Sequence, residues 1–204
     1  MPYSSPLRNQ RGVGLIELMV TIVILLIGLL GLAALQAKAS TAEMEAYQRA
    51  NALALIRDME DSLSAGRMLL TGADGFTALS ASYVGEGDGF DGCFETDGIT
   101  AKYPRAQMIL CEWSMSLKGS TERRGSNTNV GAMIGARGCL IPINSPTLPA
   151  PLAEFFVVVV WQGLSPDLDP VANSPGALCA AAVNFGSGLR RSVSTRVSIP
   201  NLTS

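Results

Sequence analysis

The sequence predicts an α+β protein in which a long N-terminal helix crosses a membrane and then packs on a small antiparallel sheet. An uncharged apolar run extends from Leu18 to Ala37, a helical stripe of apolar residues follows it, and strand patterns occupy the last third of the chain. A helical stretch followed by successive strands is typical of the α+β class. We therefore expect four parts, a leader, a membrane span, an amphipathic helical part and a globular head: residues 1–12, 13–37, 38–66 and 67–204.

The apolar run is long enough to cross a membrane. A helix rises about 1.5 Å per residue, so some twenty apolar residues span a hydrocarbon core of roughly 30 Å. Arg8 and Arg11 precede the run, and the next charge after it is Lys38. Positive charge before a first span favours a cytoplasmic N-terminus. We expect a single-span anchor, with the bulk of the chain on the other side of the membrane.

Two residues make this anchor unusual. Glu17 lies inside the apolar stretch, where a lone charge costs at least about 2.5–3.5 kcal/mol and usually marks a function. Gly12 lies at the border between the basic leader and the apolar run, and Glu17 is the fifth residue after it. A short basic leader that ends in glycine, followed by an uninterrupted apolar helix with this glutamate, resembles a type IV prepilin.

The resemblance implies a role for each of these residues. A prepilin peptidase of the bacterial inner membrane would cut after Gly12 and methylate the new amino group of Val13, where most pilins carry Phe. Glu17 in the resembling proteins sets the register of subunits during assembly. A carboxylate in lipid needs a partner, because breaking a buried pair costs about 3–5 kcal/mol. The amine of a neighbouring subunit's Val13 would supply the opposite charge.

Two other interpretations of this stretch stay open. Residues 37–39 resemble a signal-peptidase site, so cleavage after Ala39 would make the run a secretory signal. Against this, the run is longer than the usual 7–15 residues, and Glu17 would be out of place in it. Alternatively, the run is a plain anchor in which Glu17 reaches the interface near the cytoplasmic end.

The helix is expected to continue from residue 13 to residue 65, because residues 40–65 lack both Gly and Pro. Four residues recur at the spacing of one helical stripe: Ala52, Ile56, Met59 and Leu63. We expect Met44 and Tyr47 to extend this stripe and Gly66 to cap the helix. The polar side is expected to hold two ion pairs between residues four apart, Glu45–Arg49 and Arg57–Asp61.

The head is expected to begin with mixed structure. Residues 101–117 show helical spacing and predict a short helix. The acidic, glycine-rich residues 85–92 predict a solvated loop, with a calcium site as the less favoured alternative because their spacing does not fit an EF-hand. Residues 119–132 and 165–184 are also expected to be loops.

The last third of the head is expected to form a sheet. Strands are predicted over residues 139–143, 154–161 and 189–199, where β-branched and aromatic residues are frequent or apolar residues alternate with polar ones. Residues 154–161, EFFVVVVW, give the strongest of these signals. Three strands in succession predict an antiparallel meander, with the long helix on one face.

All four cysteines follow the predicted span: Cys93, Cys111, Cys139 and Cys179. An even number in an exported domain favours two disulfides, and free buried thiols are the alternative. Pairing neighbours in sequence gives Cys93–Cys111 and Cys139–Cys179, while the other two connectivities stay open. The chain has no CxxC pair and no His, so we expect neither a zinc site nor any other metal or cofactor.

Charge and composition exclude other functions. The net charge is −2 and would become −4 with the loss of Arg8 and Arg11. No basic run is interleaved with aromatic residues, so nucleic-acid binding is not expected. The absence of His excludes His-based catalysis at neutral pH, and no paired carboxylates form a recognisable site. We therefore expect a protein that is not an enzyme.

The C-terminal region sharpens the resemblance. Residues 161–163 (WQG), Cys179 and residues 185–201 (FGSGLRRSVSTRVSIPN) are similar to the PilV type of minor pilin, the type IV pilus modification protein. This resemblance implies a pilin-like fold, with the head in the periplasm and later on the pilus at the cell surface. It implies that the protein starts or modifies the fibre and takes part in adhesion and twitching motility. The implied partners are prepilin peptidase, other minor pilins, the major pilin and the inner-membrane assembly machinery.

Two alternative functions share the anchor. One is a pseudopilin of type II secretion. The other is an anchored periplasmic sensor or adhesion domain that never polymerises and works through its head.

Overall fold

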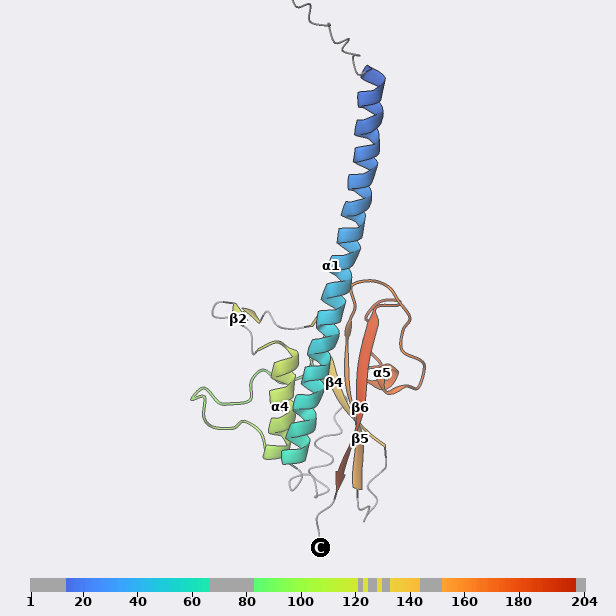
Figure 1. The fold of residues 1–204 in the computed structure, drawn as a ribbon. Coiled ribbons are helices and arrows are strands. Elements are labelled where there is room, and N and C mark those ends of the chain that lie inside the picture. Colours follow the sequence, from blue (N-terminus) through green and yellow to red (C-terminus); the bar gives the residue numbers. More distant parts are fainter. Residues whose placement is uncertain are drawn as a thin grey trace, which may run out of the picture. The chain divides into compact units, whose positions relative to one another are not determined.

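The computed structural model describes residues 14–66, 83–120, 123–124, 128–129, 133–143 and 152–200. The chain forms two compact units, Met1–Glu43 and Met44–Ser204. The described helices and strands are labelled in Figure 1: α1 (Leu15–Ala65), β1 (Val84–Gly85), α4 (Arg105–Leu117), β2 (Arg123–Arg124), β3 (Thr128–Asn129), β4 (Arg137–Pro142), β5 (Leu152–Gln162), α5 (Pro175–Leu178) and β6 (Arg190–Pro200).

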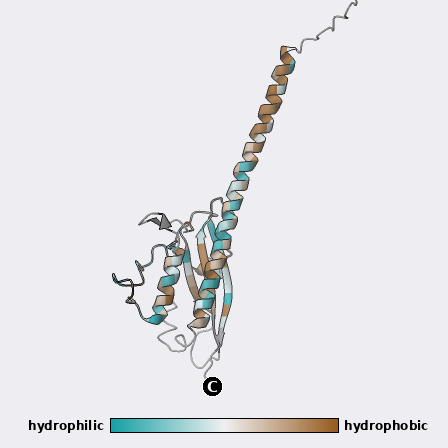
Figure 2. Cartoon of the chain, turned by 60° about the vertical axis from the view of Figure 1, so that its left-hand side comes forward, coloured by the Kyte–Doolittle hydropathy of each residue, from teal (hydrophilic) through white to brown (hydrophobic). Residues whose placement is uncertain are grey.

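The long helix α1 contains 51 residues and runs through both units. It ends at Ala65, and the Gly66 N–H donates a 2.9 Å hydrogen bond to the Ser62 carbonyl with the spacing of an ordinary helical bond. Gly66 does not adopt the left-handed conformation of a glycine cap, so the predicted cap is wrong in its conformation. The predicted end at residue 65 is confirmed, and Val13, the predicted first residue, lies outside the described residues. Figure 2 shows the first part of α1 as strongly hydrophobic and the second part as mixed, so one helix changes character along its length.

The head contains a four-stranded antiparallel sheet in the order β1-β4-β5-β6. In the central strand β5, Val158 lies opposite Cys139 of β4 and Ser194 of β6. Residues 157–160 of β5 are fully buried, which explains their continuous apolar run: both faces of the strand are covered. The predicted meander is confirmed, with strand ends shifted by one or two residues. The short strand β1 was not predicted, because two residues carry no periodic pattern.

α1 and α4 cover one face of the sheet. Their buried side chains form a core with those of the strands: Ala52, Ile56, Met59, Leu63, Val84, Leu110, Trp113, Leu117, Met133, Ala136, Leu140, Phe155, Val157, Val159 and Trp161. The Trp113 indole N–H donates a 3.0 Å hydrogen bond to the Leu55 carbonyl and so links α4 to α1. A Cβ on Gly138 would lie 2.3 Å from the Trp113 ring, so only glycine lets the indole rest on β4.

The buried stripe of α1 differs from the prediction at its N-terminal end. Ala52, Ile56, Met59 and Leu63 are buried as expected, but Met44 and Tyr47 are 52% and 58% exposed. Gln48, which is 6% exposed, takes the place on the stripe instead. At about 100° per residue, Gln48 lies roughly 40° from Ala52, whereas Met44 and Tyr47 lie roughly 80° and 140° away. The angular positions of Met44 and Tyr47 on the helix therefore decide that they are exposed, although both are apolar.

The opposite face of the sheet is covered by α5 and the segment after it. The buried residues there are Cys139, Val158, Val160, Cys179, Ala180 and Phe185. The helix α5 lies within the predicted loop 165–184, which corrects that prediction. Ser174 begins this single turn by accepting a 3.3 Å hydrogen bond from the Ala177 N–H. One turn is too short to show a helical period.

Two further sequence predictions for the head need correction. The helix α4 begins at Arg105 rather than at residue 101, because Ala101 pairs with Phe94 and Pro104 starts the helix. The strands β2 and β3 pair with each other inside the predicted loop 119–132. Two strands of two residues each are too short to show alternation.

Two disulfides link segments within the head. Cys93 is bonded to Cys111 of α4, and Cys139 of β4 is bonded to Cys179, each pair with a Cα–Cα distance of 5.6 Å. These are the two pairs that follow from neighbour pairing in the sequence. The first disulfide fixes the 93–103 segment to α4, and the second fixes the segment after α5 to the sheet.

The acidic loop 85–92 is not simply solvated, because the Asp88 side chain is only 5% exposed. Its carboxylate accepts hydrogen bonds from the Gly85 N–H (2.7 Å), the Phe90 N–H (3.0 Å) and the Ser114 hydroxyl (2.6 Å), and it forms an ion pair with Lys118. Burial by itself raises the pKa of Asp88, but Lys118, Ser114 and the two main-chain donors outweigh it and lower the pKa. Asp88 therefore joins the loop to α4, and its oxygens are already engaged.

The first prediction concerns this buried pair. Asp88→Asn removes the charge partner of Lys118 and a charged acceptor of three further hydrogen bonds, so we expect the free energy of unfolding to fall by about 2–4 kcal/mol. Asp91→Asn is the matched control, because the Asp91 side chain is 85% exposed and lies 3.6 Å from Lys102. We expect the control to change stability by less than about 0.5 kcal/mol. Urea unfolding of the intact protein in detergent measures both, and equal effects would contradict the assignment.

The second prediction concerns pH. Because the pKa of Asp88 is lowered in the folded state, its contribution is fully present above the ordinary carboxyl pKa of about 4 and is lost as pH falls below it. The difference in unfolding free energy between wild type and Asp88→Asn should therefore be constant near neutrality and shrink in acid. A difference that grows as pH falls would show that the sign is wrong.

Candidate functional site

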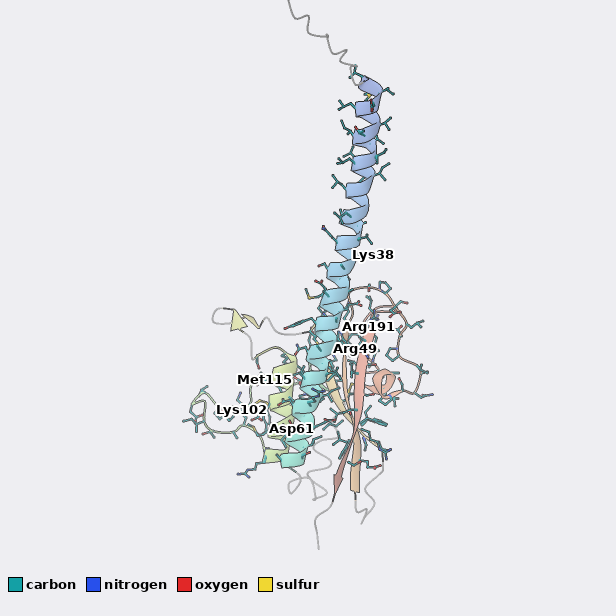
Figure 3. All side chains as sticks on the ribbon, in the orientation of Figure 1. Lys38, Arg49, Asp61, Lys102, Met115 and Arg191 are labelled. Atoms are coloured by element: carbon teal, nitrogen blue, oxygen red, sulfur yellow. A yellow bond between two sulfur atoms is a disulfide. The ribbon has the colours of Figure 1, made fainter. Side chains whose placement is uncertain are left out.

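The surface of α1 in the first unit is apolar and uncovered. Every Leu, Ile, Val and Met side chain from Leu15 to Leu35 is at least 50% exposed. Within the described residues, α1 is the one helix long and apolar enough to cross a membrane by length and composition, and its most apolar window has a mean hydropathy of 2.9. Figure 3 shows side chains projecting to both sides of this part of the helix in the view drawn. Such a surface requires lipid or other apolar helices around it.

Glu17 lies in the first turn of α1. Its N–H donates a 2.9 Å hydrogen bond to the Gly14 carbonyl, so the main chain there is already helical. The partial positive charge of a helix N-terminus favours a carboxylate at this position. Among the residues that the structure describes, no hydrogen bond or ion pair reaches the Glu17 side chain. Gly12 and Val13, the other predicted site residues, lie outside the described residues.

Small and polar residues lie on the side of α1 that carries Glu17, together with the larger Ile24 and Leu35. At about 100° per residue, Thr21, Gly28 and Gly31 fall within roughly 40° of the direction of Glu17. The Thr21 hydroxyl donates a 2.8 Å hydrogen bond to the Leu18 carbonyl, so the helix itself satisfies it. A Cβ on Gly28 or Gly31 would meet no atom of the described chain within 4 Å. Packing within the described chain therefore does not require these glycines, whereas small residues permit close approach of another helix.

In the head, Glu45 fixes α1 to the connection between β5 and β6. Its Oε1 accepts hydrogen bonds from the Leu164 N–H (3.2 Å), the Ser165 N–H (3.1 Å) and the Ser165 hydroxyl (2.8 Å). Arg191 lies 3.7 Å from the same oxygen and donates a 2.6 Å bond to the Ser165 carbonyl. Figure 3 labels Arg191 beside this part of α1. The Ser165 hydroxyl, the main-chain N–H groups and the Arg191 charge lower the pKa of Glu45, although burial opposes them.

The sequence prediction for the polar side of α1 is therefore wrong in its partners. Glu45 contacts Ser165 and Arg191 rather than Arg49. No Arg57–Asp61 ion pair occurs among the described residues either. Helical spacing predicts neighbours on one helix, but it carries no information on a partner 120 residues away.

Arg190, in the segment 185–191 (FGSGLRR), has a structural role: it binds the residues around α5. Its guanidinium donates hydrogen bonds to four carbonyls, those of Gly176, Cys179, Ala180 and Val183. It also lies 4.6 Å from the centre of the Phe185 ring. An open cavity of about 570 Å³ adjoins it, but these contacts engage the guanidinium within the fold. Arg190 therefore holds the segment around α5 on the sheet.

The structure offers no candidate metal site in the parts of the chain that it describes. No group of three or more His, Cys, Asp or Glu side chains there is arranged to hold an ion. Asp88, the buried carboxylate of the loop considered for calcium, is held by protein donors instead.

The third prediction tests the role of Glu45. Glu45→Ala removes the acceptor for the Leu164 and Ser165 N–H groups, so their amide exchange should accelerate about tenfold or more, with a stability loss of about 1 kcal/mol. Glu43→Ala is the control, since it removes an exposed carboxylate from the same helix without touching these two N–H groups. Amide exchange of the two residues measures the effect. Unchanged exchange in Glu45→Ala would contradict the assignment of Glu45 as the anchor of this connection.

The comparisons with known proteins agree with the N-terminal features. Residues 7–33 match the family model described as the prokaryotic N-terminal methylation motif. The matched residues include Gly12, Val13 and Glu17 as well as the first part of α1. No curated protein and no solved structure matches the chain. The protein therefore carries the N-terminal methylation motif of prokaryotic prepilin-like proteins, followed by a pilin-like α+β fold.

Proposed function

We propose that this protein is a minor pilin of a type IV pilus, processed by prepilin peptidase after Gly12. The observation that carries the proposal is the position of Glu17. This carboxylate lies five residues after Gly12, at the start of a helix whose apolar side chains its own chain leaves exposed. In this proposal residues 1–12 are the leader, 13–37 cross the inner membrane, 38–66 complete the helix and 67–204 form the head.

In this proposal, charge pairing sets the register of one helix against the next during assembly. Cleavage after Gly12 frees the amine of Val13, and methylation leaves its positive charge in place. A carboxylate in hydrocarbon is costly when alone but tolerated when paired. The amine of one subunit and Glu17 of the next therefore stabilise each other when the two helices come together at the correct register. A helix shifted along its neighbour leaves both charges unpaired in an apolar surrounding.

The apolar surface of α1 supplies the rest of the contact. In the inner membrane lipid covers it, and in a fibre the helices of other pilins would cover it. Because lipid is as apolar as these side chains, close packing rather than hydrophobic burial favours the helix contact in the membrane. The partners are thus other minor pilins and the major pilin, brought together by the inner-membrane assembly machinery.

The head suits an oxidising compartment outside the cytoplasm. Both disulfides lie in the head, and such bonds persist in the periplasm and at the cell surface. The proposed role of the head is to modify the fibre or help start it once α1 has entered.

The fourth prediction tests the role of Glu17. Glu17→Ala should leave the membrane level and the cleavage of the protein unchanged and reduce its content in sheared fibres about tenfold or more, because the register-setting pair is lost. Glu43→Ala is the control, since it removes an acid from the same helix beyond the apolar run. Immunoblots of sheared fibres and of membranes measure both. Equal fibre content of the two variants would contradict the proposal.

The mature N-terminal mass separates this proposal from its alternatives. A chain that begins with methylated Val13 supports prepilin processing, whereas cleavage after Ala39 removes the anchor and excludes both pilin and pseudopilin. A processed chain found in a secretion pseudopilus and absent from pili would assign it to type II secretion instead. A processed chain that stays in the membrane, without entering either fibre, would favour the anchored sensor or adhesion domain.

A further inference from the structure

The strand β6 forms one edge of the sheet in the head. It contains 11 residues, and β5 is its one strand partner among the described residues. Figure 1 shows α1 and α4 on one side of this sheet and α5 on the other, which leaves the edge itself between them. Its sequence has no Lys, its one Pro is the last residue, Pro200, and its one charged residue after Arg191 is Arg196. Natural proteins usually protect a long edge strand with such residues or with bulges.

Alternate residues of β6 direct their main-chain groups away from β5. The Gly163 N–H donates to the Leu189 carbonyl, so odd-numbered residues in this register bond toward β5. The Arg190 N–H, one residue later, donates outward to Asp169. By this alternation the N–H and C=O groups of Ser194, Arg196 and Ser198 point to the free edge.

These outward groups are accessible. Ser194, Arg196 and Ser198 are all exposed, whereas the residues between them, Thr195 and Val197, are half-buried. No described main-chain donor or acceptor outside the sheet bonds to these three residues. Nearer the start of β6 the edge is occupied, because the outward Arg190 N–H donates to Asp169, and Ser192 is half-buried with its hydroxyl against α5. The open part of the edge therefore begins after Ser192.

We propose that the edge of β6 from Ser194 to Ser198 pairs with an extended strand from the head of a neighbouring pilin subunit. The proposal rests on the proposed function, since that function brings such a neighbour to the head. A row of alternating donors and acceptors, spaced as in a strand, is satisfied along its length by another extended strand and not by a helix face. The edge therefore specifies the backbone conformation of its occupant.

The side chains along the edge specify the chemistry of that strand. On the side covered by α1, Val193 and Val197 are half-buried against the core. On the other side lie Ser194, Arg196 and Ser198, with Arg196 57% exposed and 2.7 Å from Glu154. The incoming strand should alternate, with apolar residues beside the valines and polar residues, including an acid opposite Arg196, on the other side.

Amide hydrogen exchange in assembled fibres tests the pairing. The amides of Ser194, Arg196 and Ser198 should exchange at least about tenfold more slowly in the fibre than in the mature protein in detergent. The amides of Val193, Thr195 and Val197 already bond to β5 and should change by less than about threefold. Outer amides that exchange equally in both states, or protection without this alternation, would overturn the proposal.

Proline substitution tests the same edge independently. Ser194→Pro and Ser198→Pro each remove an outward N–H while sparing the bonds to β5, a position that proline tolerates on an edge strand. Their controls, Ser194→Ala and Ser198→Ala, lose the hydroxyl and keep the N–H. We expect about tenfold less fibre content for the proline variants than for the alanine variants, at equal membrane levels. A tenfold change corresponds to a loss of about 1.4 kcal/mol in the free energy of association. Equal fibre content would overturn the proposal.

The two experiments separate this inference from the proposed function. If the wild-type chain enters fibres but its outer β6 amides stay unprotected, the edge proposal fails and the pilin assignment stands. If the wild-type chain never enters fibres, the pilin assignment fails and the edge proposal falls with it. Should the proline variants fail to fold, amide exchange in wild-type fibres decides.

Discussion

A helical surface that its own chain leaves uncovered is the constraint on which the molecule depends. From Leu15 to Leu35 the side chains of α1 are almost entirely apolar and exposed, and Glu17 is the one charge among them. Water is a poor surrounding for this surface, and lipid is a poor surrounding for the carboxylate. Only an apolar environment that also offers a cation meets both demands. In the proposed function, a neighbouring processed subunit would supply that combination.

In the head, the same helix is buried along one side. From Gln48 onward, one side of α1 is buried against the sheet and α4, and polar contacts fix its position. Glu45 holds the connection after β5, while the Trp113 indole bonds to the Leu55 carbonyl. These bonds connect the helix to segments far away in sequence, so the head presents its β6 edge on a firm support. The assembly proposals for α1 and β6 thus concern two different kinds of contact, one between helices and one between strands.

Periodicity in the sequence predicted those parts of the fold whose burial is regular. The stripe through Ala52, Ile56, Met59 and Leu63 recurs with each helical turn, and the apolar run of β5 is unbroken, so burial is readable from both. Met44 and Tyr47 show the limit of composition: they are apolar, yet their position on the helix turns them away from the core.

Among the candidate site residues, those defined by local spacing could be predicted from the sequence, and those defined by distant partners could not. The roles of Asp88 and Glu45 were not predictable, because each depends on partners that only the fold brings close. Gly12, Val13 and Glu17 belong to a motif of six consecutive residues, so their spacing along the chain is enough to identify them as candidates.

The most direct test of the central claim is a zero-length carbodiimide cross-link in intact fibres, analysed by mass spectrometry. This reagent joins a carboxylate to an amine only where the two are in contact. The account predicts a cross-linked peptide that contains this chain and a neighbouring pilin subunit. In it, either the Glu17 carboxylate of this chain is joined to the N-terminal amine of the neighbour, or the Val13 amine of this chain is joined to the neighbour's corresponding glutamate. Fibres that contain this protein and yield the Asp91–Lys102 cross-link within its head, yet neither of those products, would contradict the pairing on which the assembly mechanism rests.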